Sequence, residues 1–121
     1  MHILVSDDCI VKQAIIKIIL KEVGHTYEIV DDGEEAIKKL ESNHYDLLLI
    51  DMNMVKMGGL EATSIIRDVN SKVLNHNIPI INISSKNNEN DLDCSIKAGM
   101  NGFLGEEISF KSIKDAINKV I

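Results

Sequence analysis

The chain has 121 residues, and its 45% hydrophobic content is enough to build the core of one ordinary domain, which we expect to span residues 1–121. Thirteen Lys and Arg against 19 Asp and Glu give a net charge of −6. Because no Lys/Arg-rich block occurs, direct binding to nucleic acid or to an anionic membrane is not expected. No apolar stretch approaches the roughly 18 residues of a membrane span, and the first residues lack signal-peptide features. These observations favour a cytoplasmic protein.

Short apolar segments alternate with helical segments along the chain. The expected strands are residues 2–6, 26–30, 46–50, 79–83 and 101–104. The expected helices are residues 9–23, 33–42, 59–69, 89–98 and a last one that Ser109 caps and that runs to residue 120. Strands that are apolar throughout and joined by helices are typical of a parallel sheet covered on both faces. The pattern therefore predicts a doubly wound α/β domain.

Polar side chains follow the expected strands at the point where each strand ends. Asp7 and Asp8 follow the first strand, Asp51 follows the third and Ser84 follows the fourth. Ligands of open parallel sheets bind beyond the carboxyl ends of the strands, so we expect these side chains to lie close together. Clustered carboxylates repel one another unless a cation is shared between them, and oxygen ligands suit Mg²⁺. The sequence predicts a magnesium site at this edge.

Each of these residues also has a purely structural interpretation. Asp7 or Asp8 can be the N-cap of the helix that follows, and Asp51 alone can be a turn residue. Acids at the ends of two strands, together with a hydroxyl at the end of another, favour a site over three separate turns.

Several motifs occur in a fixed order. They are Asp7-Asp8 after the first strand, "DMNMVKMGG" at 51–59, "GLEATSIIR" at 59–67, Ser84 after "PIINI", and "AGMNGFL" at 98–104 with its aromatic Phe103. In this order and spacing the whole chain resembles the receiver domains of two-component response regulators, including the chemotaxis-regulator type. The resemblance implies a flavodoxin-like (βα)5 fold whose five parallel strands lie in the order 2-1-3-4-5.

The resemblance also implies a phosphorylation site. Asp51 would accept a phosphoryl group from a histidine kinase, a histidine phosphotransfer domain or a small phosphodonor. Asp7, Asp8, the Asp51 carboxylate and the backbone carbonyl of Asn53 would hold Mg²⁺. In such a reaction the carboxylate attacks phosphorus in line while the metal neutralises charge on the transferring oxygens. Both steps are established in phosphoryl transfer.

A switch is implied as well. Ser84 would bond the phosphoryl group and Phe103 would rotate in behind it, changing the surface of the fourth helix, fifth strand and fifth helix. A downstream effector protein or domain would recognise that surface. The implied role is that of a signalling domain rather than a separate enzyme, although the domain would assist its own phosphorylation and dephosphorylation.

The chain departs from the family after the fifth strand, where Glu106-Glu107 replaces a Lys-Pro pair. The family lysine bridges the acceptor carboxylate and the phosphoryl group. Two like charges about 4 Å apart repel by roughly 4 kcal/mol at an effective dielectric constant of about 20, so Glu106 in the lysine's place would oppose phosphorylation. Lys86 and Lys12 are candidates for a compensating cation, although either can be an ordinary surface lysine.

Other functions remain open. A pseudo-receiver would keep the fold as a protein-interaction module that does not signal through phosphate, and Glu106 favours this alternative. "DMNMV" also resembles the motif of haloacid-dehalogenase-type phosphatases, but Asn53 occupies the place of their general acid. A flavodoxin-type FMN site is disfavoured because acids, rather than a Gly, Ser and Thr phosphate cradle, follow the first strand.

Two helices bear on partner binding. In the first helix the expected core stripe is Ile15, Ile16, Ile19, Leu20 and Val23. A second apolar line, Val11, Ala14 and Ile18, is either a wider core stripe or a docking strip for a phosphotransfer helix bundle. The fourth helix has only Leu92 and Ile96 as clear apolar anchors, so we expect it to be the least stable element.

Overall fold

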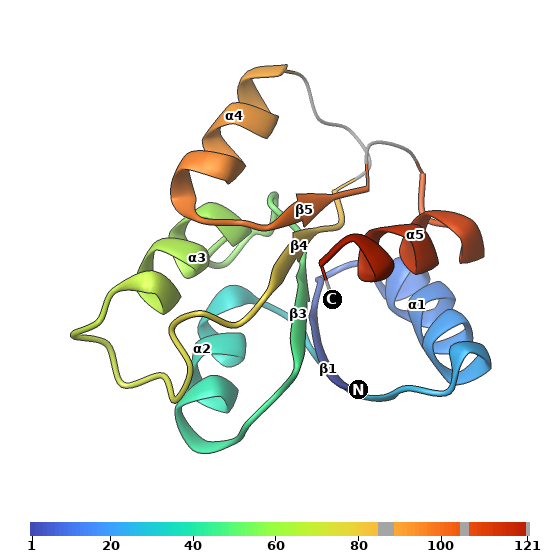
Figure 1. Cartoon of the computed structure of the whole chain (residues 1–121), viewed down its shortest axis with the longest axis horizontal. Helices are drawn as coiled ribbons and strands as arrows, with labels where there is room; N and C mark the ends of the chain where they lie inside the picture. The colour runs from blue at the N-terminus through green and yellow to red at the C-terminus, as the bar shows by residue number, and fades with distance from the viewer. Residues whose placement is uncertain (85–88, 105–106, 121) are drawn as a thin grey trace.

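Five parallel strands form one sheet at the centre of the molecule (Figure 1), and their order is β2-β1-β3-β4-β5. A computed structural model describes residues 1–84, 89–104 and 107–120. The strands are β1 (His2–Ser6), β2 (Thr26–Val30), β3 (Leu47–Ile50), β4 (Ile80–Asn82) and β5 (Gly102–Phe103). The doubly wound α/β architecture and the 2-1-3-4-5 strand order are confirmed.

Five helices cover the two faces of the sheet. They are α1 (Ile10–Val23), α2 (Gly33–Ser42), α3 (Gly59–Arg67), α4 (Glu89–Ala98) and α5 (Phe110–Val120). Helices α1 and α5 lie on one face, and α2 and α3 lie on the other, with α4 next to α3 (Figure 1). Among the described residues, no helix is long and apolar enough to cross a membrane.

The helix ends follow local capping chemistry. Helix α1 ends at Gly24, whose φ of 91° is a left-handed conformation that glycine adopts without a steric penalty. Before α5, the Ser112 amide donates to Ser109 Oγ at 3.0 Å, and the Ser109 amide donates to Ser112 Oγ at 2.9 Å. This reciprocal pair confirms Ser109 as the cap of the last helix.

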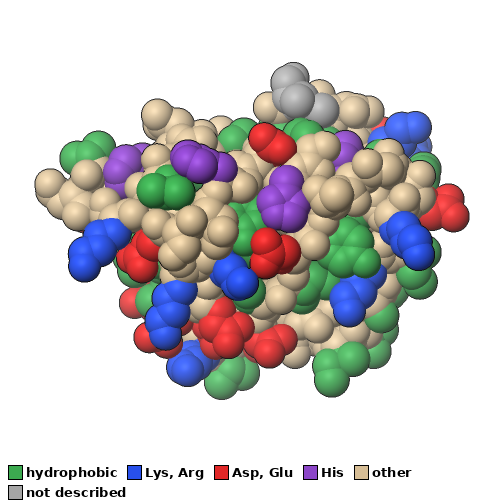
Figure 2. All heavy atoms as spheres, turned by 90° about the horizontal axis from the view of Figure 1, so that it is seen from below, with side chains coloured by type: hydrophobic (Ala, Val, Ile, Leu, Met, Phe, Trp, Pro, Cys, Tyr) green, Lys and Arg blue, Asp and Glu red, His purple; other side chains and the backbone are tan. Residues whose placement is uncertain are grey.

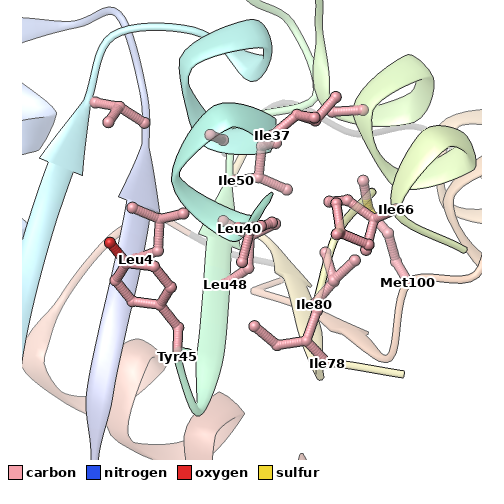
Figure 3. Close-up of a cluster of buried hydrophobic side chains, with 14 residues drawn as sticks. Leu4, Ile37, Leu40, Tyr45, Leu48, Ile50, Ile66, Ile78, Ile80 and Met100 are labelled. Atoms are coloured by element: carbon pink, nitrogen blue, oxygen red, sulfur yellow. The ribbon is translucent and has the colours of Figure 1, made fainter. Parts of the chain in front are cut away.

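Alternate residues of the strands point to opposite faces and build two core layers. Leu4, Leu48 and Ile80 face α2 and α3, where they pack in one cluster with Ile66 (Figure 3). The second cluster lies on the α1 and α5 side and includes Ile3, Val5, Leu49, Ile16 and Ile113. The strands at the centre of the sheet are therefore buried on both faces.

The far edge of the sheet is less well packed. Strand β5 has only two residues, and Ser95 is the one buried residue of α4. Ile96 is 59% exposed, so its prediction as an anchor of this helix is wrong, while Leu92 is partly buried. Helix α4 lies along α3 instead of covering the sheet with an apolar stripe of its own.

The edge of the sheet where the strands begin carries mixed charges. Figure 2, which views the molecule from below relative to Figure 1, shows acidic and basic side chains interspersed there with several histidines. His2 begins β1, and His25, His44 and His76 each precede a later strand. The carboxylates predicted to form the site follow the opposite ends of the strands.

Candidate phosphoacceptor site

Three carboxylates converge at the carboxyl edge of the sheet. Asp7 and Asp8 follow β1, and Asp51 follows the neighbouring strand β3. One oxygen of each lies within 4.8 Å of the others. The convergence predicted from the strand ends is thus present, and the pairing of β1 with β3 is its cause.

Asp51 is nearly buried and its Oδ1 atom is held by donors from two elements. The Asn53 amide donates to Oδ1 at 2.9 Å, and the Ser84 hydroxyl donates to the same oxygen. Ser84 Oγ in turn accepts the Met52 amide at 2.9 Å. The Ser84 hydroxyl, at the end of β4, therefore orients the Asp51 carboxylate, at the end of β3. These two side chains lie close together, as predicted from the strand ends.

Asp7 is fully buried. Its Oδ1 accepts the Cys9 amide at 2.8 Å, and its Oδ2 lies 2.7 Å from Lys12 Nζ. Burial raises the pKa of Asp7 above its ordinary value, since it outweighs the opposing effects of Lys12 and of the Cys9 amide. The negative charge of Asp51 acts in the same direction as burial.

Lys12 joins the two buried acids. From the first turn of α1 its ammonium reaches Asp7 Oδ2 at 2.7 Å and Asp51 Oδ2 at 3.0 Å. Burial alone would lower the pKa of Lys12, but its bonds to Asp7 and Asp51 outweigh burial and raise the pKa above its usual value. Lys12 therefore lies at the site, whereas Lys86 and Glu106, two further predicted positions, lie outside the described residues.

The loop after β3 folds tightly around Asp51. The Gly59 amide donates to the Asp51 carbonyl at 3.1 Å, and the Val55 amide donates to Asp8 Oδ2 at 3.1 Å. A Cβ atom on Gly58 would lie 2.5 Å from the Met52 carbonyl oxygen, so only glycine fits at that position. Asp8, whose side chain is exposed, thus ties this loop to the end of β1.

The remaining predicted positions lie around this centre. Asn53 is in the loop after β3, with its side chain exposed and its amide bonded to Asp51. Phe103 is in β5, opposite Asn82 of β4, and is 39% exposed. The structure places Asn53 against Asp51, and it places Phe103 on the strand next to β4, which Ser84 follows.

Gln13 belongs to the site but was not predicted. Its side-chain amide donates to the Asp7 carbonyl, and it also donates to Asp31 Oδ1 at 3.0 Å. It therefore holds the loop after β1 against the loop after β2. The available signal was a polar residue next to Lys12 in the first turn of this helix.

The outward face of α1 is strongly apolar. Val11 is 67% exposed, Ile18 is 65% exposed and Ala14 is also exposed, so these three do not widen the core stripe. Ile16, Ile19 and Leu20 are buried as predicted, but Ile15 is 38% exposed and its assignment to the core is wrong. An uncovered apolar strip therefore begins beside Lys12.

The site has the ligands of a hard divalent cation. Asp7 Oδ2 is buried and accepts no hydrogen bond other than its ion pair with Lys12 within residues 1–84, 89–104 and 107–120. Oxygens of Asp8 and Asp51 lie beside it. Carboxylate oxygens in this number suit Mg²⁺, so the residues fit the predicted metal.

The family pattern of the response regulator receiver domain matches residues 3–118. The chain belongs to this family. Over 103 residues it is 39% identical to the CAI-1 autoinducer sensor kinase/phosphatase CqsS of Vibrio cholerae, a match that covers 85% of the chain and 15% of that protein. It is 28% identical over 121 residues to the chemotaxis protein CheY of Pseudomonas aeruginosa, covering 99% of the chain and 95% of CheY.

A solved structure supports the same assignment. The receiver domain of the sensor histidine kinase PA1611 of Pseudomonas aeruginosa has a TM-score of 0.85 and 26% identity, and the match covers 98% of the chain and 94% of that domain. That structure holds a magnesium ion in its active-site cleft. The receiver domain described here spans only 15% of the length of CqsS and 10% of the length of the sensor protein EvgS of Escherichia coli.

Proposed function

We propose that residues 1–121 form one receiver domain in which Asp51 accepts a phosphoryl group from a histidine kinase or a histidine phosphotransfer domain. The single observation that carries this proposal is the arrangement around Asp51. Its carboxylate is nearly buried, is oriented by the Ser84 hydroxyl and lies within 4.8 Å of two further carboxylates. A turn residue would need neither the hydroxyl nor the acids.

The chemistry is an in-line displacement at phosphorus. A carboxylate oxygen of Asp51 forms the new O–P bond while the P–N bond of the donor phosphohistidine breaks, and the electron pair of that bond remains on the imidazole nitrogen. The Asn53 amide and the Ser84 hydroxyl fix the carboxylate before it reacts. Catalysis by this domain is then mainly positioning.

Asp7, Asp8 and Asp51, with the backbone carbonyl of Asn53, are the proposed magnesium ligands. When bound, Mg²⁺ neutralises charge on the transferring phosphoryl oxygens. Because the lysine typical of the family is replaced by Glu106, we assign to Lys12, which pairs with Asp51 at 3.0 Å, the role of the cation that neutralises Asp51 before Mg²⁺ binds. Lys86 stays a candidate from sequence alone.

The proposed output is a change at the surface of α4, β5 and α5. Ser84 would turn from Asp51 Oδ1 to the new phosphoryl group, and Phe103, which is partly exposed, would pack behind it. A downstream effector protein or domain would bind this surface. We propose a cytoplasmic phosphorelay with no direct contact to nucleic acid or membrane, in which the phosphotransfer partner docks on the apolar strip of α1.

A second function is favoured by one observation, the carboxylate at position 106 where the family has a lysine. In a pseudo-receiver the same fold would act as an interaction module without phosphorylation. The two functions differ in whether Asp51 takes up phosphate.

Intact mass spectrometry tests the proposal. After incubation with Mg²⁺ and acetyl phosphate or phosphoramidate, the wild type should gain one phosphoryl group. Asp51→Asn should gain none while keeping its circular dichroism spectrum and thermal stability, because the substitution preserves side-chain volume. An unmodified wild type would favour the pseudo-receiver, and uptake by Asp51→Asn would place the acceptor elsewhere.

A further inference from the structure

Lys12 occupies the position between two of the proposed metal ligands. Its ammonium lies 2.7 Å from Asp7 Oδ2 and 3.0 Å from Asp51 Oδ2. Asp7 Oδ2 has no other polar partner in the described part of the chain. One ammonium therefore neutralises the oxygens that a divalent cation would need, and two cations that share the same oxygens repel each other.

A cleft lies next to this position of the Lys12 side chain. The cleft has a volume of about 170 Å³ and is lined by Lys12, Ile15, Glu107 and Ile108. The two isoleucines offer an apolar wall to the methylene stem of the lysine, and Glu107 offers a carboxylate to its ammonium. A lysine has the reach and the rotamer freedom to exchange one acidic partner for the other.

We propose that Lys12 has two positions, one between Asp7 and Asp51 in the cation-free domain and one beside Glu107 when a divalent cation binds the carboxylates. In the first position the ammonium stabilises the buried acids. Binding of a divalent cation then includes the free-energy cost of moving the Lys12 ammonium. The affinity for Mg²⁺ is therefore set partly by Lys12, which is not itself a metal ligand. This inference rests on the proposed magnesium site but not on phosphorylation.

Calorimetric titration with Mg²⁺, without any phosphodonor, tests the proposal. Lys12→Met keeps the apolar stem and removes the competing charge, so it should bind Mg²⁺ on the order of tenfold more tightly than the wild type. Lys17→Met is the matched control, because Lys17 is an exposed residue of the same helix and its loss changes the net charge equally. The control should stay within about twofold of the wild type.

Glu107→Gln probes the second position. If Glu107 accepts the displaced ammonium, the amide should weaken Mg²⁺ binding by about two- to fourfold, the range of a partly exposed ion pair. The change should vanish when Lys12→Met is combined with it, because no ammonium then needs a second partner. If Glu107→Gln weakened Mg²⁺ binding equally in the Lys12→Met background, Glu107 would act without the Lys12 ammonium. That result would overturn the proposed second position of Lys12.

A measurement on the wild type covers the case in which Lys12→Met does not fold. In ¹⁵N NMR of the lysine ammonium groups, the Lys12 signal should shift as Mg²⁺ is added, while that of Lys17 should not. The proposal is overturned if the Lys12 signal is unchanged at saturating Mg²⁺, if Lys12→Met binds Mg²⁺ no more tightly than Lys17→Met, or if neither variant binds it. Failure of phosphoryl uptake would refute the proposed function and leave this result standing.

Discussion

The centre of the sheet and its β5 edge are packed very differently. Leu4 of β1 and Leu48 of β3 are completely buried, and core clusters lie on both faces of these two strands. At the edge, α4 buries only Ser95, and Phe103 of the two-residue strand β5 is 39% exposed. The difference separates a rigid part of the molecule from a part that can rearrange at little cost in free energy.

This division suits the proposed function. Asp51 follows the well-packed strand β3, where neighbouring elements fix the carboxylate, and a fixed nucleophile reacts faster than a mobile one. The surface proposed to change is at the weakly packed edge, where two arrangements differ by less free energy. Ser84 follows β4, the strand that lies between β3 and β5.

The largest expected effect on stability comes from the centre. Leu48→Ala removes a side chain with no exposed surface from the middle of the sheet (Figure 3). The lost burial and the cavity left behind should lower the free energy of unfolding by about 3 kcal/mol. Urea denaturation monitored by circular dichroism measures this change.

Ile96→Ala, on α4, is the matched control for Leu48→Ala. Because Ile96 is 59% exposed, its truncation should change the free energy of unfolding by less than about 0.5 kcal/mol. Equal losses in the two variants would mean that the edge is as firmly packed as the centre.

Arg67 connects the two regions, and its loss should have an intermediate effect. Its guanidinium donates to the Gly99 carbonyl at 3.0 Å, the His76 carbonyl at 2.7 Å and Asn101 Oδ1 at 2.8 Å. Arg67→Met keeps much of the stem but removes the donor to the Gly99 and His76 carbonyls, whereas Asn101 Oδ1 still accepts the Ile80 amide. We therefore expect the free energy of unfolding to fall by about 2 kcal/mol, as measured by thermal or urea denaturation.

Lys72→Met, at an exposed lysine in the loop after α3, controls for the change in charge and should shift stability by less than about 0.5 kcal/mol. A loss in Arg67→Met no larger than that of this control would show that the edge does not depend on Arg67.

Much of the architecture could be predicted from the sequence because the signals were local. Apolar runs that end at Asp7 and Asp51 predicted both the strands and the edge of the sheet where the carboxylates meet. Which face of α1 packs against the sheet was harder to predict, because nearly every face of this helix carries an isoleucine or valine. Ile15 was therefore assigned to the core, although the packing of α1 leaves it 38% exposed.

The partners of the site residues depended on tertiary structure. Lys12 was one of two candidate cations, and only the placement of α1 against β3 shows its 3.0 Å contact with Asp51. Gln13 was missed because its bonds to Asp7 and Asp31 join two loops that the sequence does not relate. The Ile96 prediction failed because α4 packs along α3 and leaves this side chain in solvent.

Hydrogen exchange followed by mass spectrometry tests most directly whether phosphorylation at the rigid site reaches the weakly packed edge. With Mg²⁺ and acetyl phosphate, exchange in peptides from residues 89–104 should slow in the wild type, because Phe103 becomes buried, and should not change in Asp51→Asn. Peptides from β1 and β3 should change little in either protein. Unchanged exchange at residues 89–104 in phosphorylated wild type, or equal slowing in Asp51→Asn, would contradict this account.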